Sequence, residues 1–303
     1  MTLLVSGWVA LDAIETPFAK VKQSLGGSAT CAALAAAQFT DVRLLAAIGE
    51  DFPEGEQAKL EGRGIDLAGL TTIEGGTTSR WGARYHYDMN TRDTLFTHLG
   101  VNDGWKPVLP AGWEDSSTAF MAADDPQAQL GLLGALPSAR ATMVDTIQIY
   151  IDTAKKGVEA AMRAADFASV NETEARQLTG QASIAKAGRA LVEAGAKAAL
   201  IKLGEYGAVY ASPDDYFVAP GYPLEDVVDP TGAGDTFAGA FMGYLDTAEV
   251  TPGEVRRAII YGSAVASFAV EGFGPSRLLE LTRDEVEERY REFRAFTHFE
   301  EAG

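Results

Sequence analysis

The sequence predicts an α/β protein whose central sheet is mostly parallel and is covered by helices on both faces. From Thr118 onward, short apolar runs that suit buried strands alternate with longer segments of helical pattern, which is typical of right-handed βαβ units. Polar or glycine-containing segments follow several of these runs. Because the carboxyl ends of parallel strands meet at one edge, where ligands collect, we expect the functional residues at that edge.

Composition limits the classes of function. The chain has 303 residues, 47% of them hydrophobic, and a formal net charge of −18. Nucleic-acid surfaces need basic stripes, so this acidity argues against such a partner. One cysteine, no basic leader and no apolar run of membrane-spanning length predict a cytoplasmic protein without a membrane partner. No repeat or linker divides the sequence, so we expect a single domain over residues 1–303.

The N-terminal third begins with an apolar strand, Leu3-Leu4-Val5, and Asp12 follows it closely. The Gly-x-Gly-x-x-Gly fingerprint of a dinucleotide fold is missing after this strand, which weighs against a dehydrogenase. Gly26-Gly27 then opens a helix of small residues, expected from Ser28 to Ala37. Two glycines before a helix can simply form a tight connection.

The pattern of residues 77–99 predicts a β-hairpin, because β-branched and aromatic residues flank a cluster of turn-forming residues at 90–93. The hairpin is expected to stand away from the main sheet, and a further strand is expected at 18–22. If residues 80–87 form a strand, the side chains alternate between two faces. One face carries Arg80, Arg84 and His86, and the other carries aromatic residues.

Two more segments follow predicted strands in the middle of the chain. The sequence Asn171-Glu172-Thr173-Glu174 fits a helix start, with Asn171 as the cap and acids in the first turn. Lys202-Leu203-Gly204-Glu205-Tyr206-Gly207 fits a turn between two strands.

The most informative stretch runs from Val227 to Phe241, where an apolar run ends in Asp-Pro and a Gly-Ala-Gly-Asp turn opens a helix. Gly232 and Gly234 can adopt backbone angles that let peptide N–H groups point into one hollow. A helix N-terminus in that place favours an anion. Asp235 in the same turn suits removal of a proton from a hydroxyl beside a phosphate, whereas a simple helix cap is the alternative reading.

The string from Asp229 to Phe237, Asp-Pro-Thr-Gly-Ala-Gly-Asp-Thr-Phe, resembles the C-terminal signature of the ribokinase-like carbohydrate kinases, the PfkB family. The resemblance covers Asp12 to Gly274, with the motifs in the family's order. It implies a three-layer α/β/α fold with a small β lid, formed by segments of about 13–24 and 75–100 that include the hairpin. It also implies that Asp235 is the catalytic base and that Gly232, Ala233 and Gly234 form the anion hole.

The resemblance assigns further residues. Binding of the substrate falls to residues near the N-terminus, to a strand end and to the lid: Asp12, Gly26, Gly27, Ser28, Cys31, Arg84, Asp124 and Asp235. Family members often have Asn where this chain has Cys31, which removes a hydrogen-bonding side chain beside the substrate. Binding of ATP falls to residues of the later turns and helices: Asn171, Lys202, Gly204, Gly207, Gly232, Gly234, Ser267 and Phe268. Asn171 and Glu174 would hold Mg²⁺ through water, and Asp229 a K⁺ ion.

These assignments predict an ATP-dependent, Mg²⁺-requiring kinase that phosphorylates a hydroxyl of a small sugar. A nucleoside kinase of the adenosine or cytidine type is the alternative, and a non-catalytic sugar sensor is the alternative of another class. With the aromatic face of the lid inward the acceptor is unphosphorylated; with the basic face inward, Arg84 would clamp a phosphate on it. The family's lid also suggests a homodimer.

Overall fold

The computed structural model describes residues 1–298 and 300. Its main sheet has nine strands in the order β13-β12-β11-β10-β9-β8-β1-β4-β5, parallel except where β12 pairs with β11 and β13. The strands of this sheet are β1 (Thr2–Ser6), β4 (Asp41–Gly49), β5 (Ile65–Ile73), β8 (Thr118–Met121), β9 (Ala141–Val144), β10 (Phe167–Asn171), β11 (Ala199–Lys202), β12 (Ala208–Ala211) and β13 (Tyr216–Ala219).

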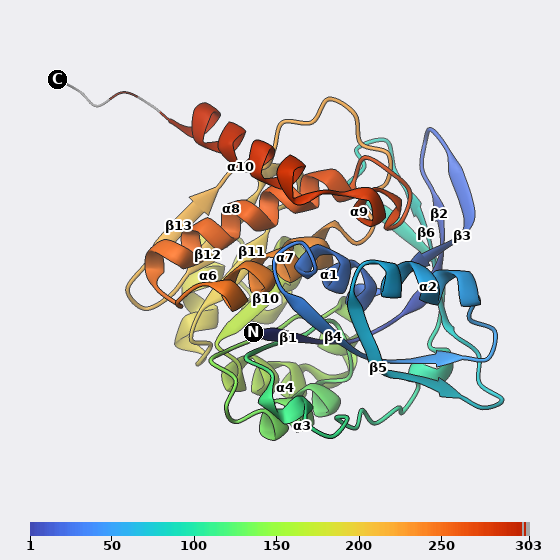
Figure 1. Cartoon of the computed structure of the whole chain (residues 1–303). Helices are drawn as coiled ribbons and strands as arrows, with labels where there is room; N and C mark the ends of the chain where they lie inside the picture. The colour runs from blue at the N-terminus through green and yellow to red at the C-terminus, as the bar shows by residue number, and fades with distance from the viewer. Residues whose placement is uncertain (299, 301–303) are drawn as a thin grey trace.

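Helices cover both faces of the sheet, and each face has its own apolar core. Leu132, Met162 and Leu191 anchor one helical layer, while Phe241, Ile259 and Val286 anchor the other. Figure 1 shows α3 and α4 on one side of the sheet and α7, α8 and α10 on the other. The predicted three-layer α/β/α fold is therefore confirmed. The helices are α1 (Ser28–Ala36), α2 (Glu54–Gly62), α3 (Pro126–Ala135), α4 (Gln148–Ala164), α5 (Glu172–Thr179), α6 (Ile184–Glu193), α7 (Ala233–Thr247), α8 (Pro252–Ala269), α9 (Ser276–Glu280) and α10 (Arg283–Thr297).

The predicted lid is a separate four-stranded sheet in the order β3-β2-β6-β7, which stands at one side of the main sheet (Figure 1). Its strands are β2 (Ala10–Glu15), β3 (Lys20–Gly26), β6 (Ser79–Tyr85) and β7 (Arg92–His98). The lid begins at Ala10, earlier than the expected boundary near residue 13. Asp12 therefore lies on a lid strand that pairs with both β3 and β6.

Small residues bring helix α7 against helix α1. A side chain at Gly239 would place its Cβ 2.2 Å from the carbonyl oxygen of Ala32, and one at Gly243 would place it 2.8 Å from Cα of Ala36. Glycine is needed because the two backbones touch at these positions. The N-terminal turn of α7 consequently meets the start of α1, and these two turns form the centre of the site.

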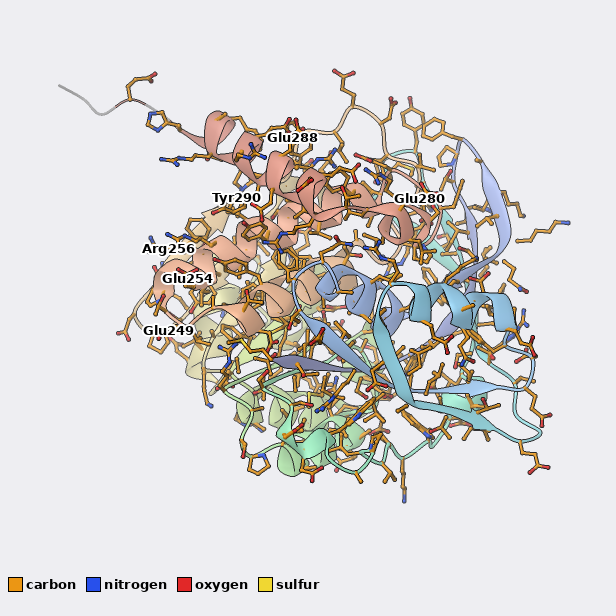
Figure 2. All side chains as sticks on the ribbon, viewed as in Figure 1. Glu249, Glu254, Arg256, Glu280, Glu288 and Tyr290 are labelled. Atoms are coloured by element: carbon orange, nitrogen blue, oxygen red, sulfur yellow. The ribbon has the colours of Figure 1, made fainter. Side chains whose placement is uncertain are left out.

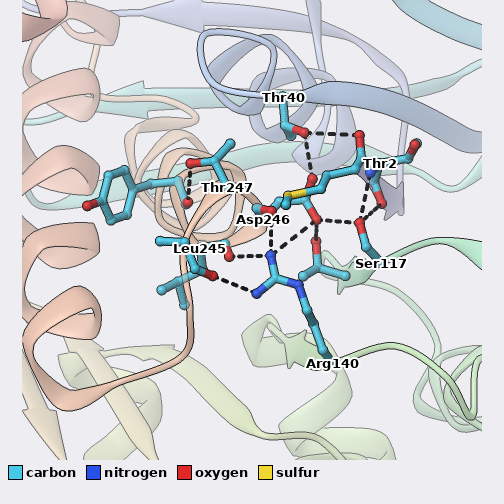
Figure 3. Close-up of polar contacts among 11 residues, drawn as sticks. Thr2, Thr40, Ser117, Arg140, Leu245, Asp246 and Thr247 are labelled. Atoms are coloured by element: carbon cyan, nitrogen blue, oxygen red, sulfur yellow. Dashed lines mark hydrogen bonds and ion pairs between the residues drawn. The ribbon is translucent and has the colours of Figure 1, made fainter.

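The C-terminal end of α7 is fixed by a buried polar network (Figure 3). The side chain of Asp246 is fully buried. Its carboxylate accepts hydrogen bonds from three hydroxyl groups and forms an ion pair with one guanidinium. These partners are Thr40 Oγ1 (2.5 Å), Ser117 Oγ (2.6 Å), Thr118 Oγ1 (2.8 Å) and Arg140 Nη2 (3.7 Å). Arg140 also donates to the carbonyl oxygens of Leu245 and Ala248, 2.6 Å away in each case, and so caps the helix. The network locks α7 to the amino-terminal edge of the sheet.

Helices α8 and α10 form an outer surface that carries charged side chains, among them Glu254, Arg256 and Glu288 (Figure 2). Beneath these charges, Tyr261 stacks on Tyr290 with ring centroids 4.1 Å apart. This contact attaches α10 to the body of the molecule. No helix of the described chain is both long and apolar enough to span a bilayer.

Candidate active site

The turn before α7 has the geometry of an anion site. Gly232 is the N-cap of the helix and has a left-handed conformation, with φ of 76°. Within the described residues the N–H of Gly234 has no hydrogen-bond acceptor, whereas the N–H of Ala233 donates to the Pro230 carbonyl over 3.3 Å. The free N–H at a helix N-terminus favours a negatively charged group. The expectation that both glycines need unusual backbone angles is wrong for Gly234, whose φ is not positive.

Cys31 lies directly against this turn. A Cβ at Gly232 would fall 2.5 Å from the Cys31 sulfur, so the two residues leave no room for a larger neighbour. Burial and the charge of Asp235 raise the pKa of the Cys31 thiol, which excludes a thiolate nucleophile at neutral pH. Cys31 therefore packs as a buried, neutral side chain against the turn that opens α7.

Asp235 stands in the first turn of α7 with part of its surface accessible. Burial and the charge of Asp145 raise its pKa to about 6, against the opposing effects of Lys202 and Arg92. Among the described residues, no side chain donates a hydrogen bond to its carboxylate. A carboxylate with this pKa is ionised at pH 7 and accepts a proton more readily than an ordinary aspartate, as a general base requires.

Lys202 lies behind the anion site, with its ammonium 3.4 Å from where a Cβ at Gly234 would be. It forms an ion pair with Asp145 Oδ2, which also accepts a hydrogen bond from Ser169 Oγ at 2.9 Å. Burial would lower the pKa of Lys202, but the charges of Asp145 and Asp235 outweigh it and raise the pKa. Lys202 therefore remains a cation close to the turn.

Asn171 and Glu174 form a reciprocal capping box at the start of α5. Asn171 Oδ1 accepts from the N–H of Glu174 at 2.9 Å, and Glu174 Oε2 accepts from the N–H of Asn171 at 2.8 Å. Burial and the charge of Asp145 raise the pKa of Glu174 to about 7. Among the described residues none donates a hydrogen bond to Glu174 Oε1, so the helix start can serve both as a cap and as part of a site for hard cations.

The turn at 204–207 joins β11 to β12 and contacts the tip of the lid. Gly204 has φ of 59°, and a Cβ on it would lie 2.8 Å from Oδ1 of Asn90 in the lid. Asn90 also donates to Glu205 Oε1 at 3.0 Å. Gly207 has φ of 98°, and its Cβ would lie 2.1 Å from the carbonyl oxygen of Ala219. Both glycines are thus required by the local backbone.

Asp12 and the glycine pair lie together on the other side of the anion turn. A side chain at Gly26 would place its Cβ 2.0 Å from Asp12 Oδ2, so only glycine fits there. Gly27 is the N-cap of α1 and has φ of 93°. Burial raises the pKa of Asp12 to about 7, with further contributions from Asp229 and Asp235. Asp12 Oδ1 is buried and has no hydrogen-bond partner in the described chain. An unpaired buried acceptor is costly, so it fits a site that binds a donor group from a ligand.

Asp124, at the end of β8, is held by Trp8. The indole Nε1 donates to Asp124 Oδ1 at 3.2 Å, and burial raises the pKa of Asp124 to about 6. Ser28 joins this group because its Oγ accepts from the N–H of Trp8 and donates to the Ala123 carbonyl, both at 3.3 Å. The hydroxyl of Tyr150 has its pKa raised by burial and by the charge of Asp124. The predicted residues Ser28 and Asp124 are therefore joined by Trp8.

Asp229 ties the signature turn to the end of α8. Its Oδ1 accepts from the N–H of Thr231 at 2.9 Å and its Oδ2 from the N–H of Gly274 at 3.0 Å. Burial raises the pKa of Asp229. Both oxygens thus fix the loop that precedes α7.

The aromatic face of the lid points inward. Tyr85 is 5% exposed, and its hydroxyl lies 3.1 Å from Thr231 Oγ1 in the signature turn. Arg84 points outward instead, with a half-exposed side chain, and pairs with Glu15 at 3.1 Å. The structure therefore does not support the expectation that Arg84 binds substrate, because the strand alternation that buries Tyr85 turns Arg84 to the outer face.

Ser267 and Phe268 are buried beneath helix α10 rather than exposed for a nucleotide. The guanidinium of Arg289 lies 3.4 Å from the ring centroid of Phe268, and its Nη1 donates to Ser267 Oγ at 3.0 Å. Arg277 lies 4.9 Å from the same ring centroid. Because the Phe268 ring already contacts two guanidinium groups and Ser267 Oγ already accepts a hydrogen bond from Arg289, the structure does not support the expected role of either side chain in nucleotide binding.

Sequence reasoning left out several residues of this site. Asp145 directly follows the buried strand β9, and Asp124 lies three residues beyond the end of the neighbouring strand β8, so carboxylates beyond strand ends were a usable signal. Trp8 and Tyr150 carry no local signal, since only the fold brings them to Asp124. The same holds for Arg92 of the lid, whose orientation depends on the pairing of β6 with β7.

Comparison with known proteins identifies the family. A model described as pfkB family carbohydrate kinase matches residues 14–281. The chain belongs to this family. It is thus a kinase, and the resemblance inferred from the signature turn is confirmed.

PfkB kinases with different acceptors are similar to it. A cytidine kinase from Thermococcus kodakarensis is 32% identical over 250 residues, covering 80% of this chain and 87% of that protein.

A bifunctional ribokinase/ribose-5-phosphate isomerase A from Fructilactobacillus sanfranciscensis is 28% identical over 263 residues. The alignment covers 82% of this PfkB kinase and 46% of the bifunctional protein, so the chain spans about half of that relative. Among solved structures, a nucleoside kinase from Methanocaldococcus jannaschii has a TM-score of 0.79 at 21% identity, covering 96% of this chain and 98% of that chain. This agreement supports the ribokinase fold.

Proposed function

We propose that this PfkB kinase transfers the γ-phosphoryl group of ATP to a hydroxyl of a small, uncharged sugar. Asp235 carries the proposal, because its carboxylate, with a pKa of about 6, stands beside a helix N-terminus with a free N–H. In the reaction the acceptor oxygen attacks the γ-phosphorus, the bond to the bridging oxygen of ADP breaks, and the hydroxyl proton goes to Asp235. The N–H of Gly234 and the ammonium of Lys202 stabilise the negative charge of the transferring group.

The electrostatics of the acceptor pocket favour an uncharged substrate. Asp12 and Asp124 are 6% exposed each, and Asp12 has an unpartnered oxygen. A phosphate already on the acceptor would be repelled by these carboxylates, since Arg84 is turned to the outer face of the lid. Hydroxyl groups of a sugar, in contrast, are the donors that buried carboxylates require. The aromatic residues Trp81 and Tyr85 supply an apolar face for the ring.

The nucleotide side fits ATP with Mg²⁺. Within the described residues one carboxylate oxygen of Glu174 accepts no hydrogen bond, and burial together with the charge of Asp145 raises the pKa of Glu174, so a divalent cation would relieve repulsion there. Mg²⁺ would be held by Asn171 and Glu174 through water and would neutralise phosphate charge when bound. Lys202 and the turn at Gly204 and Gly207 would border the phosphates. Asp229 fits K⁺ less well, because both its oxygens already accept backbone N–H groups.

A nucleoside kinase of the cytidine or adenosine type is the second candidate. The 32% identity to a cytidine kinase favours it, as does Cys31, which cannot offer the hydrogen bonds of the Asn that family members often have at this position. A nucleoside presents the same ribose hydroxyls, with a base that can stack on the lid. A sensor without catalysis is disfavoured because such a protein has no need for a base at the anion site.

We also propose that two copies of the chain pair through their lids. Phe18 is 67% exposed and Tyr87 82% exposed, and their ring centroids lie 6.0 Å apart on neighbouring lid turns. Exposed aromatic pairs of this kind are typical of protein contacts. Replacing both by Ser should convert a dimer to a monomer in light scattering, and a wild-type monomer would contradict the pairing.

The decisive experiment measures ADP release across a panel of sugars, sugar phosphates and nucleosides, with ATP and Mg²⁺ present. Activity with an unphosphorylated sugar is expected, and Asp235→Asn serves as the blank. Higher kcat/KM with nucleosides would select the second candidate. Activity confined to a sugar phosphate would contradict the uncharged acceptor, and no ADP release with any acceptor would refute the kinase proposal.

A further inference from the structure

The three neighbouring strands β9, β10 and β11 carry an ion pair at each edge of the sheet. At the amino-terminal edge, Asp166 lies just before β10 and pairs with Lys197, with 2.7 Å between Oδ1 and Nζ. Thr142 of β9 donates its hydroxyl to Asp166 Oδ2 at 2.8 Å. The side chains of Lys197 and Asp166 are 64% and 30% exposed. An exposed ion pair of this kind contributes little to stability.

At the carboxyl edge the same three strands bury a second pair. Asp145 directly follows β9, and its Oδ2 pairs with the ammonium of Lys202, the last residue of β11. The hydroxyl of Ser169 on β10 donates to the same oxygen at 2.9 Å, and the N–H of Thr146 donates to Oδ1 at 2.8 Å. The side chains of Asp145 and Lys202 are only 3% and 14% exposed. Both carboxylate oxygens are thus held in place, and Lys202 is bound to a fixed point.

The paired ammonium lies beside the turn that opens α7. A Cβ at Gly234 would lie 3.4 Å from Lys202 Nζ, 3.5 Å from its Cδ and 3.6 Å from its Cε. Among the described residues, Asp145 is the one hydrogen-bond acceptor of this ammonium, which has three N–H bonds. Within that part of the chain, two N–H bonds of Lys202 are therefore left for an anion bound at the turn.

A carboxylate so close to an anion site is unfavourable unless it has a second effect. The charge of Asp145 repels a phosphoryl group and so opposes its transfer. The stem of Lys202, however, has four flexible carbons, and its ammonium could otherwise adopt many positions. Charge in a transition state is stabilised best by donors that are already in place, because they need no reorganisation during the reaction. Fixing the ammonium is therefore a benefit that offsets the repulsion.

We propose that Asp145 is a positioning residue that holds the Lys202 ammonium at the anion site during phosphoryl transfer, and that Ser169 holds Asp145. The inference rests on the proposed kinase reaction. Asp145 gives up and accepts no proton, and it acts only through Lys202. An amide cannot replace this carboxylate, because one oxygen accepts from Thr146 and the other from Ser169 and Lys202. The NH2 group of an asparagine would meet a donor in either orientation.

The test is a double-mutant cycle between Asp145 and Lys202. Lys202→Met should lower kcat by about a hundredfold and Asp145→Asn by about tenfold or more, with the acceptor KM changed less than about threefold. Adding Asp145→Asn to Lys202→Met should cost no further activity, because the ammonium that Asp145 positions is gone. Losses that multiply, to about a thousandfold in the double variant, would show that Asp145 acts independently of Lys202 and would overturn the proposal.

Asp166→Asn is the matched control, since it breaks the similar pair at the opposite edge of the same strands. Its kcat should stay within about threefold of wild type, and a loss equal to that of Asp145→Asn would overturn the assignment. Ser169→Ala provides a second cycle should Asp145→Asn not fold. It should lower kcat by about fivefold when Lys202 is present and leave it unchanged in Lys202→Met. An equal effect in both backgrounds, including none, would contradict the positioning role.

Calorimetry gives a readout that does not depend on turnover. Asp145→Asn should bind ADP within about threefold of wild type but bind ADP with aluminium fluoride, a mimic of the transferring phosphoryl, at least about tenfold more weakly. Unchanged affinity for ADP with aluminium fluoride, or equal weakening for ADP alone, would overturn the proposal. If wild type releases no ADP with any acceptor, the proposed function fails, and the aluminium fluoride measurement still decides the role of Asp145.

Discussion

The two ends of helix α7 carry two aspartates in opposite situations. At the C-terminal end, the carboxylate of Asp246 is completely buried and accepts from three hydroxyl groups, with a guanidinium close by. At the N-terminal end, Asp235 accepts no side-chain hydrogen bond within the described residues, and burial together with Asp145 raises its pKa to about 6. One carboxylate is fully satisfied, whereas the other is left in need of a partner.

One end of helix α7 therefore contributes to the stability of the fold, and the other end carries the candidate catalytic residue. The network at Asp246 joins α7 to β1, β4 and β8 at the amino-terminal edge of the sheet, which parallel α/β proteins do not use for ligands. Near the other end of the helix, Asp145 repels both Glu174 and Asp235, and Asp229 and Asp235 repel Asp12, whose Oδ1 has no hydrogen-bond partner within the described residues. Small glycines in α7 hold the helix close to α1, so the stable end positions the reactive end.

The largest effect is expected at the reactive end. Asp235→Asn should lower kcat by about a hundredfold or more, because the amide cannot accept the proton of the acceptor hydroxyl. The melting temperature should stay the same or rise, since the variant removes one of several repelling carboxylates. Steady-state kinetics and thermal unfolding measure both. Turnover near that of wild type would remove Asp235 from its role, and a large loss of stability would show that the two ends are not distinct.

At the opposite end the pattern should reverse. Asp246→Ala removes a buried carboxylate that accepts from three hydroxyl groups and pairs with Arg140, so the free energy of unfolding should fall by about 3 kcal/mol. The kcat of the folded fraction should change less than about threefold, because Asp246 lies at the far end of the helix. Urea unfolding and activity at 20 °C would test this. A loss below 0.5 kcal/mol, by the same unfolding measure, would mean that the network contributes little.

A smaller effect is expected at the glycine that joins the two helices. Gly232→Ala introduces a Cβ 2.5 Å from the Cys31 sulfur at a backbone φ of 76°, so it should turn the anion-binding N–H groups and lower kcat about tenfold. Gly180→Ala is the matched control, with φ of 69° and open space around its Cβ. Both variants should lose about 1 kcal/mol of stability, but only Gly232→Ala should lose activity. Equal kcat values would show that the turn tolerates a side chain.

The sequence predicted the layers of the fold and the reactive end of α7, because both depend on local patterns. Alternating apolar runs specify the parallel sheet, and the turn at 229–235 combines glycine geometry with a carboxylate in a few consecutive residues. Arg84 was expected in the site and Arg92 was not, since the register of a lid hairpin is set by pairing across the sheet. The cation–π contact between Arg289 and Phe268 could not be predicted from the sequence either, because it depends on how α10 packs on α8.

The smallest effect concerns pH, and it follows from the unsatisfied acids. Asp12 and Glu174 have pKa values of about 7, and Asp124 and Asp235 about 6, all raised first by burial. Their folded state therefore holds more protons than the unfolded state between about pH 4 and pH 7, so stability falls as pH rises through that window. Glu285 behaves in the opposite way, because hydrogen bonds from Thr282 lower its pKa to about 2. Its contribution to the free energy of unfolding is lost only as the pH falls toward that value.

We expect the melting temperature to drop by about 5 °C between pH 5.5 and pH 8. The Asp12→Asn/Asp235→Asn double variant should show about half of that drop, because it cannot lose protons at two of the four positions. Measurement in 0.5 M NaCl reduces the contribution of the net charge of −18, which also grows less favourable as pH rises. An equal slope in wild type and double variant would mean that surface repulsion, and not the acids at the reactive end of α7, sets the pH dependence.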